Sequence, residues 1–452
     1  MIQKLPLDDY FLNEMRSEYL SYTTVGISPN AILFYYRLKE FYWTVTRLLG
    51  LGHLHDGARP RNTHTPIRPS APPRAAGADR TPWSMRRNRI LFDATATYRS
   101  GDANGIQRVI REIAKFGFAS ADALPVIIDN GRLIPFFDHP SLPDTIEPAE
   151  GDVLVLLDAG WNHVDEIEPI AEIITRRGGR VVAGLYDLIP LNHPLSVCPQ
   201  LRRAFAGWME RVVLKADAVV CISKFTAMEF SAFLARSQSP VKAGLQIGWW
   251  RLGADFNQRR LPPASRRIVA QFSKRSPVFL SVGTLEPRKG YSVALDACEQ
   301  LWRDGVDMRY CIVGRPGWQS RGLELRIRRH PEYKRRLLWF DNASDADLAE
   351  CYQRAHALLY PSALEGFGLP LVEAARHGLP VIASDLDVFR EIGGDAPRYV
   401  EPLNSAELAA AMRDSLTARK QGSAPAFYSW RESADDLFQM IGGERYQIQI
   451  AD

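Results

Sequence analysis

Short apolar runs alternate with amphipathic stretches along most of the chain after residue 90. Such alternation is typical of parallel strands connected by helices, because both faces of a parallel sheet are buried. The runs that we predict to be strands form two sets, 90–92, 153–157, 180–185 and 218–222, then 278–282, 310–313, 337–340, 357–360 and 380–383. The pattern predicts an α/β fold with two parallel-sheet domains and, because ligands bind at the carboxyl ends of such strands, a site in the cleft between them.

The N-terminal part of the chain has a different pattern. Ser28 and Pro29 are typical of a helix start, and the residues after them carry one narrow polar stripe on an otherwise aromatic and aliphatic surface. We therefore predict an N-terminal helical extension over residues 1–53. Its helix, at 28–52, lies either in a membrane interface or against the protein's own surface or a second subunit. Residues 54–88, rich in Pro and Arg, are predicted to be a disordered linker.

Two carboxylates, two glycines and a helix start lie close together between Glu365 and Glu373. Gly366 and Gly368 allow the backbone to turn with exposed N–H groups, and Pro370 suits the first turn of a helix. The helix N-terminus offers N–H groups and partial positive charge to a diphosphate. Glu373, one turn into the helix, is placed to accept hydrogen bonds from a ribose, and Glu365 is placed to meet a sugar. The pattern predicts a site for a sugar nucleotide.

Breaking a sugar–diphosphate bond builds negative charge on the leaving phosphate, so a transferase needs fixed cations and N–H donors there. Arg288 and Lys289, at a helix start that follows a predicted strand, are candidates to supply the charge, the alternative being a solvated helix start. Gly105 opens an amphipathic helix after the strand at 90–92. This order of strand, glycine loop and helix is a second candidate anion site.

From residue 90 to about residue 440 the chain resembles the retaining glycosyltransferases of family 4, which have the GT-B fold of two Rossmann-like domains. The segment from Glu365 to Glu373 is similar to that family's Glu-x7-Glu motif. Further similar blocks occur in the family's order at 105–108, 186–190, 221–224, 282–290, 312–318 and 360–362. The resemblance implies that a sugar moves from a nucleotide-diphosphate donor with retention of its anomeric configuration.

The resemblance also implies roles for individual residues. The residues with implied catalytic roles are Glu365, Lys289, Arg288 and Asp187, of which Lys289 contacts the phosphate. The residues implied to bind the donor are Glu373, Gly366, Phe367, Gly368, Leu369, Leu371, Val372, Gly314, Gly105 and Tyr186. In this set the backbone N–H groups of 367–369 hold sugar hydroxyls and those of 371 and 372 hold phosphates. Gly314 receives the base or, alternatively, belongs to a plain turn.

Two positions depart from the family's pattern. Tyr186 stands where many relatives have the histidine of a His-Asp pair, and Thr284 stands near the place of a usual arginine. The first change removes an imidazole that often positions the donor sugar, and the second leaves more of the phosphate charge to the remaining cations. His163 and His193 are expected to be structural or acceptor-side residues.

The strand pattern breaks between the two sets. We place a Rossmann-like acceptor domain at 89–260 and a nucleotide-sugar donor domain at 261–428. Ser429 and Glu432 have the spacing of a capping box that opens a final helix, and in the family this helix crosses back to the first domain. The final helix and tail therefore occupy 429–452.

Composition narrows the class of protein further. A length of 452 residues suits two large domains, and a net charge of +4 does not indicate nucleic-acid binding. The five cysteines lie far apart without a Cys-x-x-Cys pair, and the N-terminus lacks a secretory pattern, which together favour the cytoplasm. No apolar stretch reaches the roughly 18 residues that span a bilayer. Because no residues have metal-ligand spacing, we expect neither a cofactor nor a required metal.

Together with the resemblance, these observations predict a metal-independent transferase that moves a mannose-like sugar to a lipid-linked glycan at the inner face of the cytoplasmic membrane. The resemblance implies that this glycan belongs to bacterial surface polysaccharide synthesis. The lipid-linked acceptor rests on the aromatic N-terminal helix, the basic linker and a basic cluster that faces either anionic lipid or solvent. This cluster comprises Arg326, Arg328, Arg329, Lys334, Arg335 and Arg336. The alternatives are a nucleotide-sugar 2-epimerase, a transferase for soluble sugars and a scaffold protein with a decayed site. A nicotinamide dehydrogenase is disfavoured, since no Gly-x-Gly-x-x-Gly follows an early strand.

Overall fold

The computed structural model describes residues 68–450, with gaps at 80, 101–104, 121, 238, 256–261 and 418–426. The chain divides into two units, Met1–Thr65 and Pro66–Asp452, and all described residues belong to the second. The predicted helix at 28–52 and the first part of the predicted linker lie outside the described residues.

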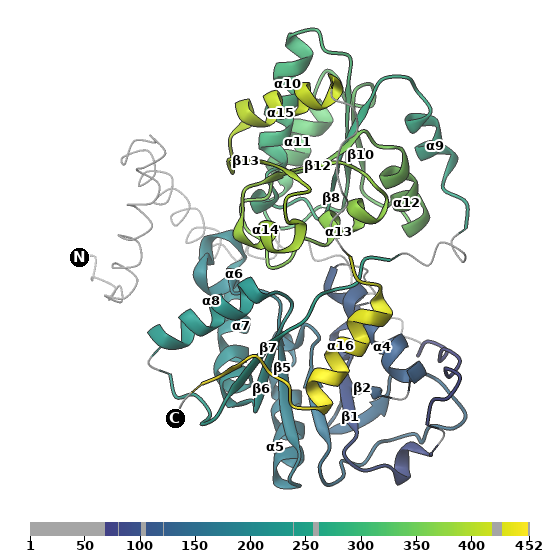
Figure 1. Ribbon diagram of the computed structural model, residues 1–452, viewed down its shortest axis with the longest axis vertical. Helices are drawn as coiled ribbons and strands as arrows, with labels where there is room; N and C mark the ends of the chain where they lie inside the picture. Colours follow the sequence, from purple (N-terminus) through teal and green to yellow (C-terminus); the bar gives the residue numbers. More distant parts are fainter. Residues whose placement is uncertain are drawn as a thin grey trace, which may run out of the picture. The chain divides into compact units, whose positions relative to one another are not determined.

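The first of two sheets has the strand order β14-β7-β6-β5-β4-β1-β2-β3 (Figure 1). Its central strands pair in parallel, and the pairs at its two edges, β2 with β3 and β7 with β14, are antiparallel. The strands are β1 (Ile90–Asp93), β2 (Ala123–Asp129), β3 (Arg132–Pro135), β4 (Val153–Leu156), β5 (Arg180–Leu185), β6 (Ala218–Cys221), β7 (Gln246–Trp249) and β14 (Ile448–Gln449). The helices of this domain are α3 (Thr95–Ser100), α4 (Gly105–Ser120), α5 (Val164–Arg176), α6 (Ile189–Asn192), α7 (Pro199–Arg211), α8 (Lys224–Arg236) and α16 (Trp430–Gly442).

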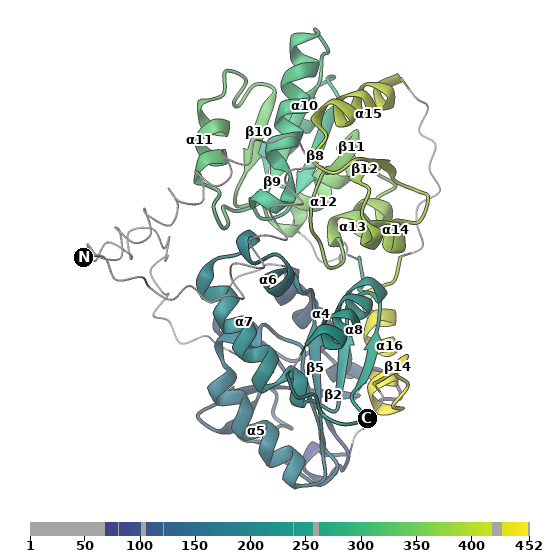
Figure 2. The same cartoon turned by 90° about the vertical axis from the view of Figure 1, so that its left-hand side faces the viewer.

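The second sheet has the order β10-β9-β8-β11-β12-β13, and all its pairs are parallel (Figure 2). Its strands are β8 (Val278–Val282), β9 (Arg309–Val313), β10 (Leu337–Phe340), β11 (Ala357–Tyr360), β12 (Val381–Ser384) and β13 (Arg398–Val400). Its helices are α9 (Arg266–Phe272), α10 (Tyr291–Arg303), α11 (Arg321–Arg329), α12 (Asp345–Arg354), α13 (Leu369–Arg376), α14 (Asp387–Gly393) and α15 (Ser405–Thr417). The two parallel-sheet domains confirm the predicted fold class.

Most of the parallel strands form because their residues are largely apolar on both faces. Every residue of β1, β4, β6, β8, β9, β10 and β11 is buried, as expected for parallel strands covered by helices on each side. Each predicted strand is present to within one residue at either end. The strands that the pattern did not predict include the edge strands β3, β13 and β14, which are short and partly exposed.

Residues 68–88 correct the prediction of a disordered linker, because they make specific contacts with the first domain. Trp83, in a short 3-10 helix, is 3% exposed. Arg74 Nη1 donates a hydrogen bond of 2.9 Å to the Phe118 carbonyl oxygen. One buried tryptophan supplies enough apolar area to fix a segment that is otherwise rich in proline and arginine.

The last helix, α16, packs against α4 of the first domain, and the two helices lie side by side in Figures 1 and 2. Ser429 and Glu432 form the capping box at its N-terminus, each side chain bonding the other residue's backbone N–H. The chain therefore returns from the second sheet to the first before it ends in β14.

Candidate active site

The loop after β11 carries Glu365, whose side chain is 8% exposed. Its Oε1 accepts hydrogen bonds from Lys289 Nζ and, at 2.8 Å each, from the hydroxyls of Tyr360 and Ser362. Its Oε2 lies 3.4 Å from Arg288 Nη1. Burial alone would raise the pKa of Glu365, but the Lys289 ammonium and the Arg288 guanidinium lower it to about 2. Glu365 is therefore an ionised carboxylate held by two cations.

Lys289 and Arg288 lie in a 3-10 turn, η7 (Pro287–Lys289), between β8 and α10. Gly290 ends this turn with φ of 69°, and a Cβ there would lie 2.0 Å from the Pro361 carbonyl oxygen. Only glycine combines this backbone conformation with so close an approach. The glycine thus brings both cations against the loop that carries the carboxylate.

The charges of the two cations are balanced by carboxylates. Burial lowers the pKa of Lys289, although Glu365 opposes this effect. Burial would also lower the pKa of Arg288, but the carboxylates of Glu365 and Glu286 raise it, and Arg288 Nε donates to Glu286 Oε2 at 2.8 Å. The turn therefore presents fixed positive groups beside the helix start that was predicted to bind a diphosphate.

Glu373 lies on α13 and is 4% exposed. Its Oε1 forms an ion pair with Arg108 of α4, and its Oε2 accepts a hydrogen bond of 2.6 Å from the Tyr352 hydroxyl of α12. The Tyr352 ring stacks on His377 with centroids 5.6 Å apart. A carboxylate has about four lone-pair positions, so Glu373 can accept further hydrogen bonds from a ligand.

The loop of Gly366 meets the first domain directly. The Gly366 carbonyl oxygen accepts hydrogen bonds from the hydroxyls of Ser223, at 2.8 Å, and Thr226, at 3.3 Å, at the start of α8. A Cβ on Gly366 would lie 2.1 Å from the Tyr186 carbonyl oxygen. The close contact between the domains therefore requires glycine at this position.

Glu391 of α14 makes a second contact between the domains. Its carboxylate accepts hydrogen bonds from the backbone N–H groups of Lys224, at 2.8 Å, and Phe225, at 2.7 Å. These N–H groups lie in the first turn of α8, where a carboxylate is favoured by the helix dipole. The second domain thus caps a helix of the first.

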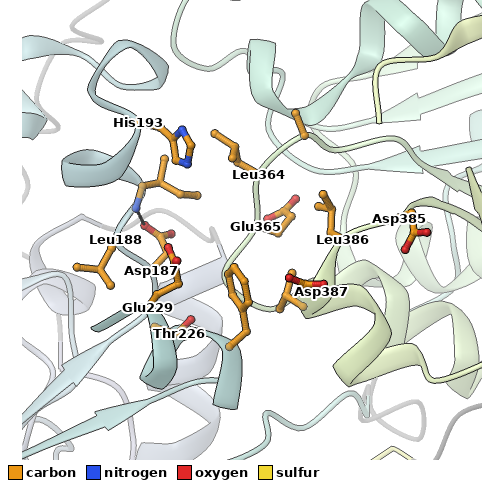
Figure 3. A pocket seen from close by; sticks show the side chains of 14 residues that line it. Asp187, Leu188, His193, Thr226, Glu229, Leu364, Glu365, Asp385, Leu386 and Asp387 are labelled. Carbon is orange, nitrogen blue, oxygen red and sulfur yellow. Dashed lines mark hydrogen bonds between the residues drawn. The ribbon is translucent and has the colours of Figure 1, made fainter. Parts of the chain in front are cut away.

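A pocket of about 240 Å³ lies beside this contact (Figure 3). Asp187, His193 and Glu229 line it from the first domain, and Glu365 and Asp387 line it from the second. Burial raises the pKa of Asp187 and lowers the pKa of His193. The lining is rich in hydrogen-bond acceptors and poor in cations, which suits a neutral ligand with several hydroxyls.

The Tyr186 hydroxyl is buried and has no hydrogen-bond partner among the described residues. Burial raises the pKa of Tyr186 well above its ordinary value, so the hydroxyl is neutral and can donate. A buried hydroxyl without a partner costs free energy. Tyr186, which was predicted to stand in the place of a histidine, therefore offers a hydrogen-bonding group at this position.

Several other residues that were predicted to bind the donor shape or pack the loop and the first turn of α13. Gly368 has φ of 101° and is the N-cap of α13, which again requires glycine. Phe367 and Val372 are buried in the core. The Leu371 N–H donates to the Gly368 carbonyl oxygen at 2.9 Å, so it already has a protein partner.

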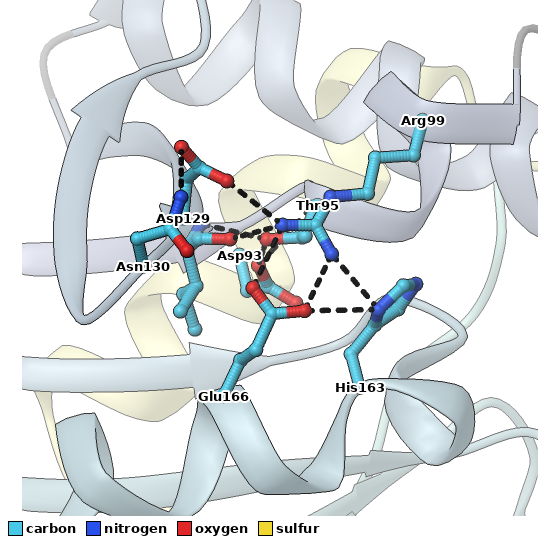
Figure 4. A network of polar contacts seen from close by, with 8 residues as sticks. Asp93, Thr95, Arg99, Asp129, Asn130, His163 and Glu166 are labelled. Atoms are coloured by element: carbon cyan, nitrogen blue, oxygen red, sulfur yellow. Dashed lines mark hydrogen bonds and ion pairs between the residues drawn. The ribbon is translucent and has the colours of Figure 1, made fainter.

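Gly314 and His163 do not join this cluster. A Cβ on Gly314 would lie 1.8 Å from the Gly283 carbonyl oxygen, so backbone packing alone accounts for the glycine. His163 contacts Arg99 and Glu166 in a separate network of the first domain (Figure 4). The binding of a base by Gly314 stays a prediction.

The basic cluster predicted to face lipid or solvent is partly neutralised within its own domain. Arg326 donates to Asp296 at 2.6 Å, and Glu332 pairs with both Arg335 and Arg336. These ion pairs hold the pKa of Glu332 at about 2. They weaken the case for this cluster as a surface that attracts anionic lipid.

Reasoning from the sequence missed three contributors to the site. Tyr352 and Glu391 carry no local signal, because their partners lie far away in the sequence. Arg108 belonged to a block of resemblance but had no predicted role. Local patterns reveal the polar groups of one turn, whereas the contact of Tyr352 joins two helices of the second domain and the contacts of Arg108 and Glu391 join the two domains.

Some features are not found in the described part of the chain. Between residues 68 and 450, outside the gaps given above, no group of His, Cys, Asp and Glu side chains is arranged to hold a metal ion. No described helix is long and apolar enough to cross a membrane. All five cysteines lie in the described residues and are free thiols.

Comparison with known proteins identifies the class that this fold and site define. Over 79% of its length the chain superposes with TM-score 0.54 and 19% identity on 97% of sucrose-phosphate synthase from Thermosynechococcus elongatus. The chain also superposes on Anabaena HepE in complex with UDP and glucose, with TM-score 0.53 and 18% identity. This match covers 78% of the chain and 95% of HepE. The fold is therefore GT-B.

The family follows from the sequence comparison. Residues 265–425 match the model of the glycosyl transferases group 1 family. The chain is 30% identical over 390 residues to a serotype-specific mannosyltransferase, WbdA, of Escherichia coli; the match covers 79% of this chain and 48% of the relative, about half its length. The chain belongs to the group 1 glycosyl transferases, family 4.

Proposed function

We propose that this chain transfers a sugar from a nucleotide-diphosphate donor to a hydroxyl of a glycan, with retention of configuration and without a metal. The observation that carries the proposal is the ionised Glu365 held by Lys289 and Arg288 next to the N-terminus of α13. A diphosphate at this helix start would meet both cations. Glu373, further along the same helix, is the proposed acceptor of hydrogen bonds from the ribose.

The charges of this cluster suit the reaction. As the bond between sugar and phosphate breaks, negative charge grows on the leaving diphosphate, and cations that are already in place stabilise it without reorganisation. Glu365 stays ionised because its pKa is about 2. It can therefore accept hydrogen bonds from sugar hydroxyls and stabilise the positive charge that develops on the anomeric carbon.

The acceptor is proposed to enter from the first-domain side of the pocket, where Asp187, His193 and Glu229 offer polar groups. We propose a mannose-like sugar and a surface polysaccharide, such as an O-antigen, because the relative from Escherichia coli is named a serotype-specific mannosyltransferase. A lipid-linked acceptor and a position at the inner face of the cytoplasmic membrane complete the proposal. The segment that would contact the membrane, 28–52, lies outside the described residues.

A two-stage assay tests this function. UDP, GDP and ADP are first compared by thermal shift, since a ligand at about a hundred times its Kd stabilises a protein by about 2.7 kcal/mol. The sugar nucleotides of the preferred base are then incubated with the enzyme and either a bacterial lipid extract or soluble sugars. Transfer to the lipid fraction supports the proposal, and transfer to soluble sugars alone favours the other acceptor class. Conversion of the donor to a 2-epimer would identify an epimerase, and no ligand binding would favour a scaffold.

The membrane contact has its own test. A chain that begins at residue 68 keeps Trp83 and its contacts, so it should fold and bind nucleotide. Loss of binding to anionic vesicles in this shorter chain would support a membrane role for the N-terminal segment. Equal vesicle binding by both chains would remove that support.

A further inference from the structure

We propose that Arg108 is a donor-binding residue supplied by the first domain, which bridges the Glu373 carboxylate and the donor diphosphate. The inference rests on the proposed function and adds a residue to the donor site. It starts from the ion pair between Arg108 Nη1 and Glu373 Oε1, which joins α4 of the first domain to α13 of the second.

The two helices bring their N-termini together. Gly105 is the first residue of α4, and a Cβ there would lie 3.7 Å from Leu369 Cδ1, at the first residue of α13. The pair of Arg108 and Glu373 lies about one turn further along both helices. Positive helix ends and a guanidinium therefore converge on the region where the diphosphate of the donor would join its ribose.

The charge of Arg108 complements that of the two other cations. Lys289 and Arg288 share the carboxylate of Glu365, and Arg288 also pairs with Glu286, so this cluster of two cations and two carboxylates carries little net charge. The Arg108 side chain is 21% exposed while that of Glu373 is 5% exposed. The guanidinium is thus more accessible to a ligand than the buried carboxylate with which it pairs.

A guanidinium can make both contacts at once. It carries five N–H donors in a planar fork, which fits a carboxylate on one edge and a phosphate on another. The Trp430 ring of α16, 5.9 Å from the guanidinium carbon, packs near its face. Lysine has neither the fork nor the planar face, so it should replace Arg108 only in part.

The test compares ligands with and without phosphate, using the full chain. The nucleoside diphosphate that stabilises the unaltered protein most, from UDP, GDP and ADP, and its parent nucleoside are titrated by calorimetry. Arg108→Gln should weaken diphosphate binding by roughly 10- to 100-fold, the range for a lost charge-assisted contact, and leave nucleoside binding within about twofold. The diphosphate affinity of Arg108→Lys should lie between those of Arg108→Gln and the unaltered protein. Glu373→Gln should weaken binding of both ligands.

Arg111→Gln is the matched control, because it removes the same charge from the same helix one turn away. It should leave both affinities within about twofold of the unaltered protein. Unchanged diphosphate binding in Arg108→Gln, or an equal loss for diphosphate and nucleoside, overturns the inference while leaving the proposed function in place. Should Arg108→Gln not fold, full diphosphate affinity in Arg108→Lys overturns it. If the unaltered protein binds no nucleoside diphosphate, the proposed function itself fails.

Discussion

Glu365 of the second domain and Asp93 of the first are both buried carboxylates, but their pKa values differ. Glu365 faces two cations, which lower its pKa to about 2 despite its burial. Asp93, at the end of β1, is 1% exposed, and burial together with the nearby charge of Asp158 raises its pKa to about 7. Burial therefore sets the cost of a charge, and the partners decide whether the charge is kept.

The surroundings of Asp93 explain the difference (Figure 4). Asp93 accepts a hydrogen bond of 3.1 Å from the Thr95 N–H. Arg99 is the cation nearby, but it is engaged by Glu166, at 2.6 and 2.8 Å, and by Asp129, at 3.3 Å. One cluster thus holds its carboxylate ionised next to positive charge, and the other shares one arginine among several acids.

The largest effect is expected from breaking the Glu365 cluster. Lys289→Ala should lower turnover by roughly 100-fold, because it removes a cation that stabilises the leaving phosphate. Steady-state kinetics with the donor found above measure this. Lys242→Ala is the control, since Lys242 also pairs with a carboxylate, Asp217 at 2.7 Å, but lies away from the site. Full activity in Lys289→Ala would move the phosphate site elsewhere.

The second effect concerns the protonation of Asp93. Its pKa is about 7 in the folded protein and about 3.9 when unfolded, so its stabilising contribution is present below pH 4 and is lost as the pH rises through 7. Asp93→Asn keeps the hydrogen-bond acceptor and removes this dependence. Denaturant unfolding should show it more stable than the unaltered protein by roughly 4 kcal/mol at pH 8, because each unit of pKa shift corresponds to about 1.4 kcal/mol, with little difference at pH 4.

Asp129→Asn provides the comparison for that experiment. Its carboxylate belongs to the same network, but its side chain is 47% exposed. At pH 8 we expect its free energy of unfolding to differ from that of the unaltered protein by less than about 1 kcal/mol, because an exposed ion pair contributes little. A gain at pH 8 as large as that of Asp93→Asn would show that the network as a whole, rather than Asp93, determines the effect.

Glu365→Gln should give the opposite pattern to Asp93→Asn. The pKa of Glu365 is depressed, so its contribution is present above about pH 4 and is lost only as the pH falls toward 2. Between pH 5 and pH 8 the free energy of unfolding of this variant should therefore change with pH in the same way as that of the unaltered protein, although its turnover falls. A different pH dependence of the free energy of unfolding in this range would mean that Glu365, like Asp93, changes its protonation there.

The smallest expected effect is that of a chelator. If fixed side chains and N–H groups stabilise the leaving diphosphate, excess EDTA should leave the initial rate unchanged within about twofold. The assay is repeated with magnesium or manganese added back. A loss of activity that either ion restores would contradict a metal-independent reaction.

The sequence predicted those parts of the fold and site that depend on local patterns. The strand Val278–Val282 was found because both its faces are buried, and the helix start after Gly368 because glycine and proline mark it. Trp83 was missed because a single aromatic residue has no periodicity. The contacts of Glu373 with Arg108 and of Glu391 with α8 were missed because each joins the two domains. The contact of Glu373 with Tyr352 was missed because it joins two separate helices of the second domain.

The contact of Glu391 with α8 places a carboxylate of the protein at a helix N-terminus. The N-terminus of α8 opens toward the same junction of the domains as α13, and in isolation it would attract a phosphate equally well. A carboxylate of the protein already sits there, bonded to two of its N–H groups. A sugar nucleotide that lay in reverse across the junction would bring its negative charge against that of Glu391. Under the proposed function, the carboxylate of Glu391 would therefore disfavour this reversed orientation of the donor.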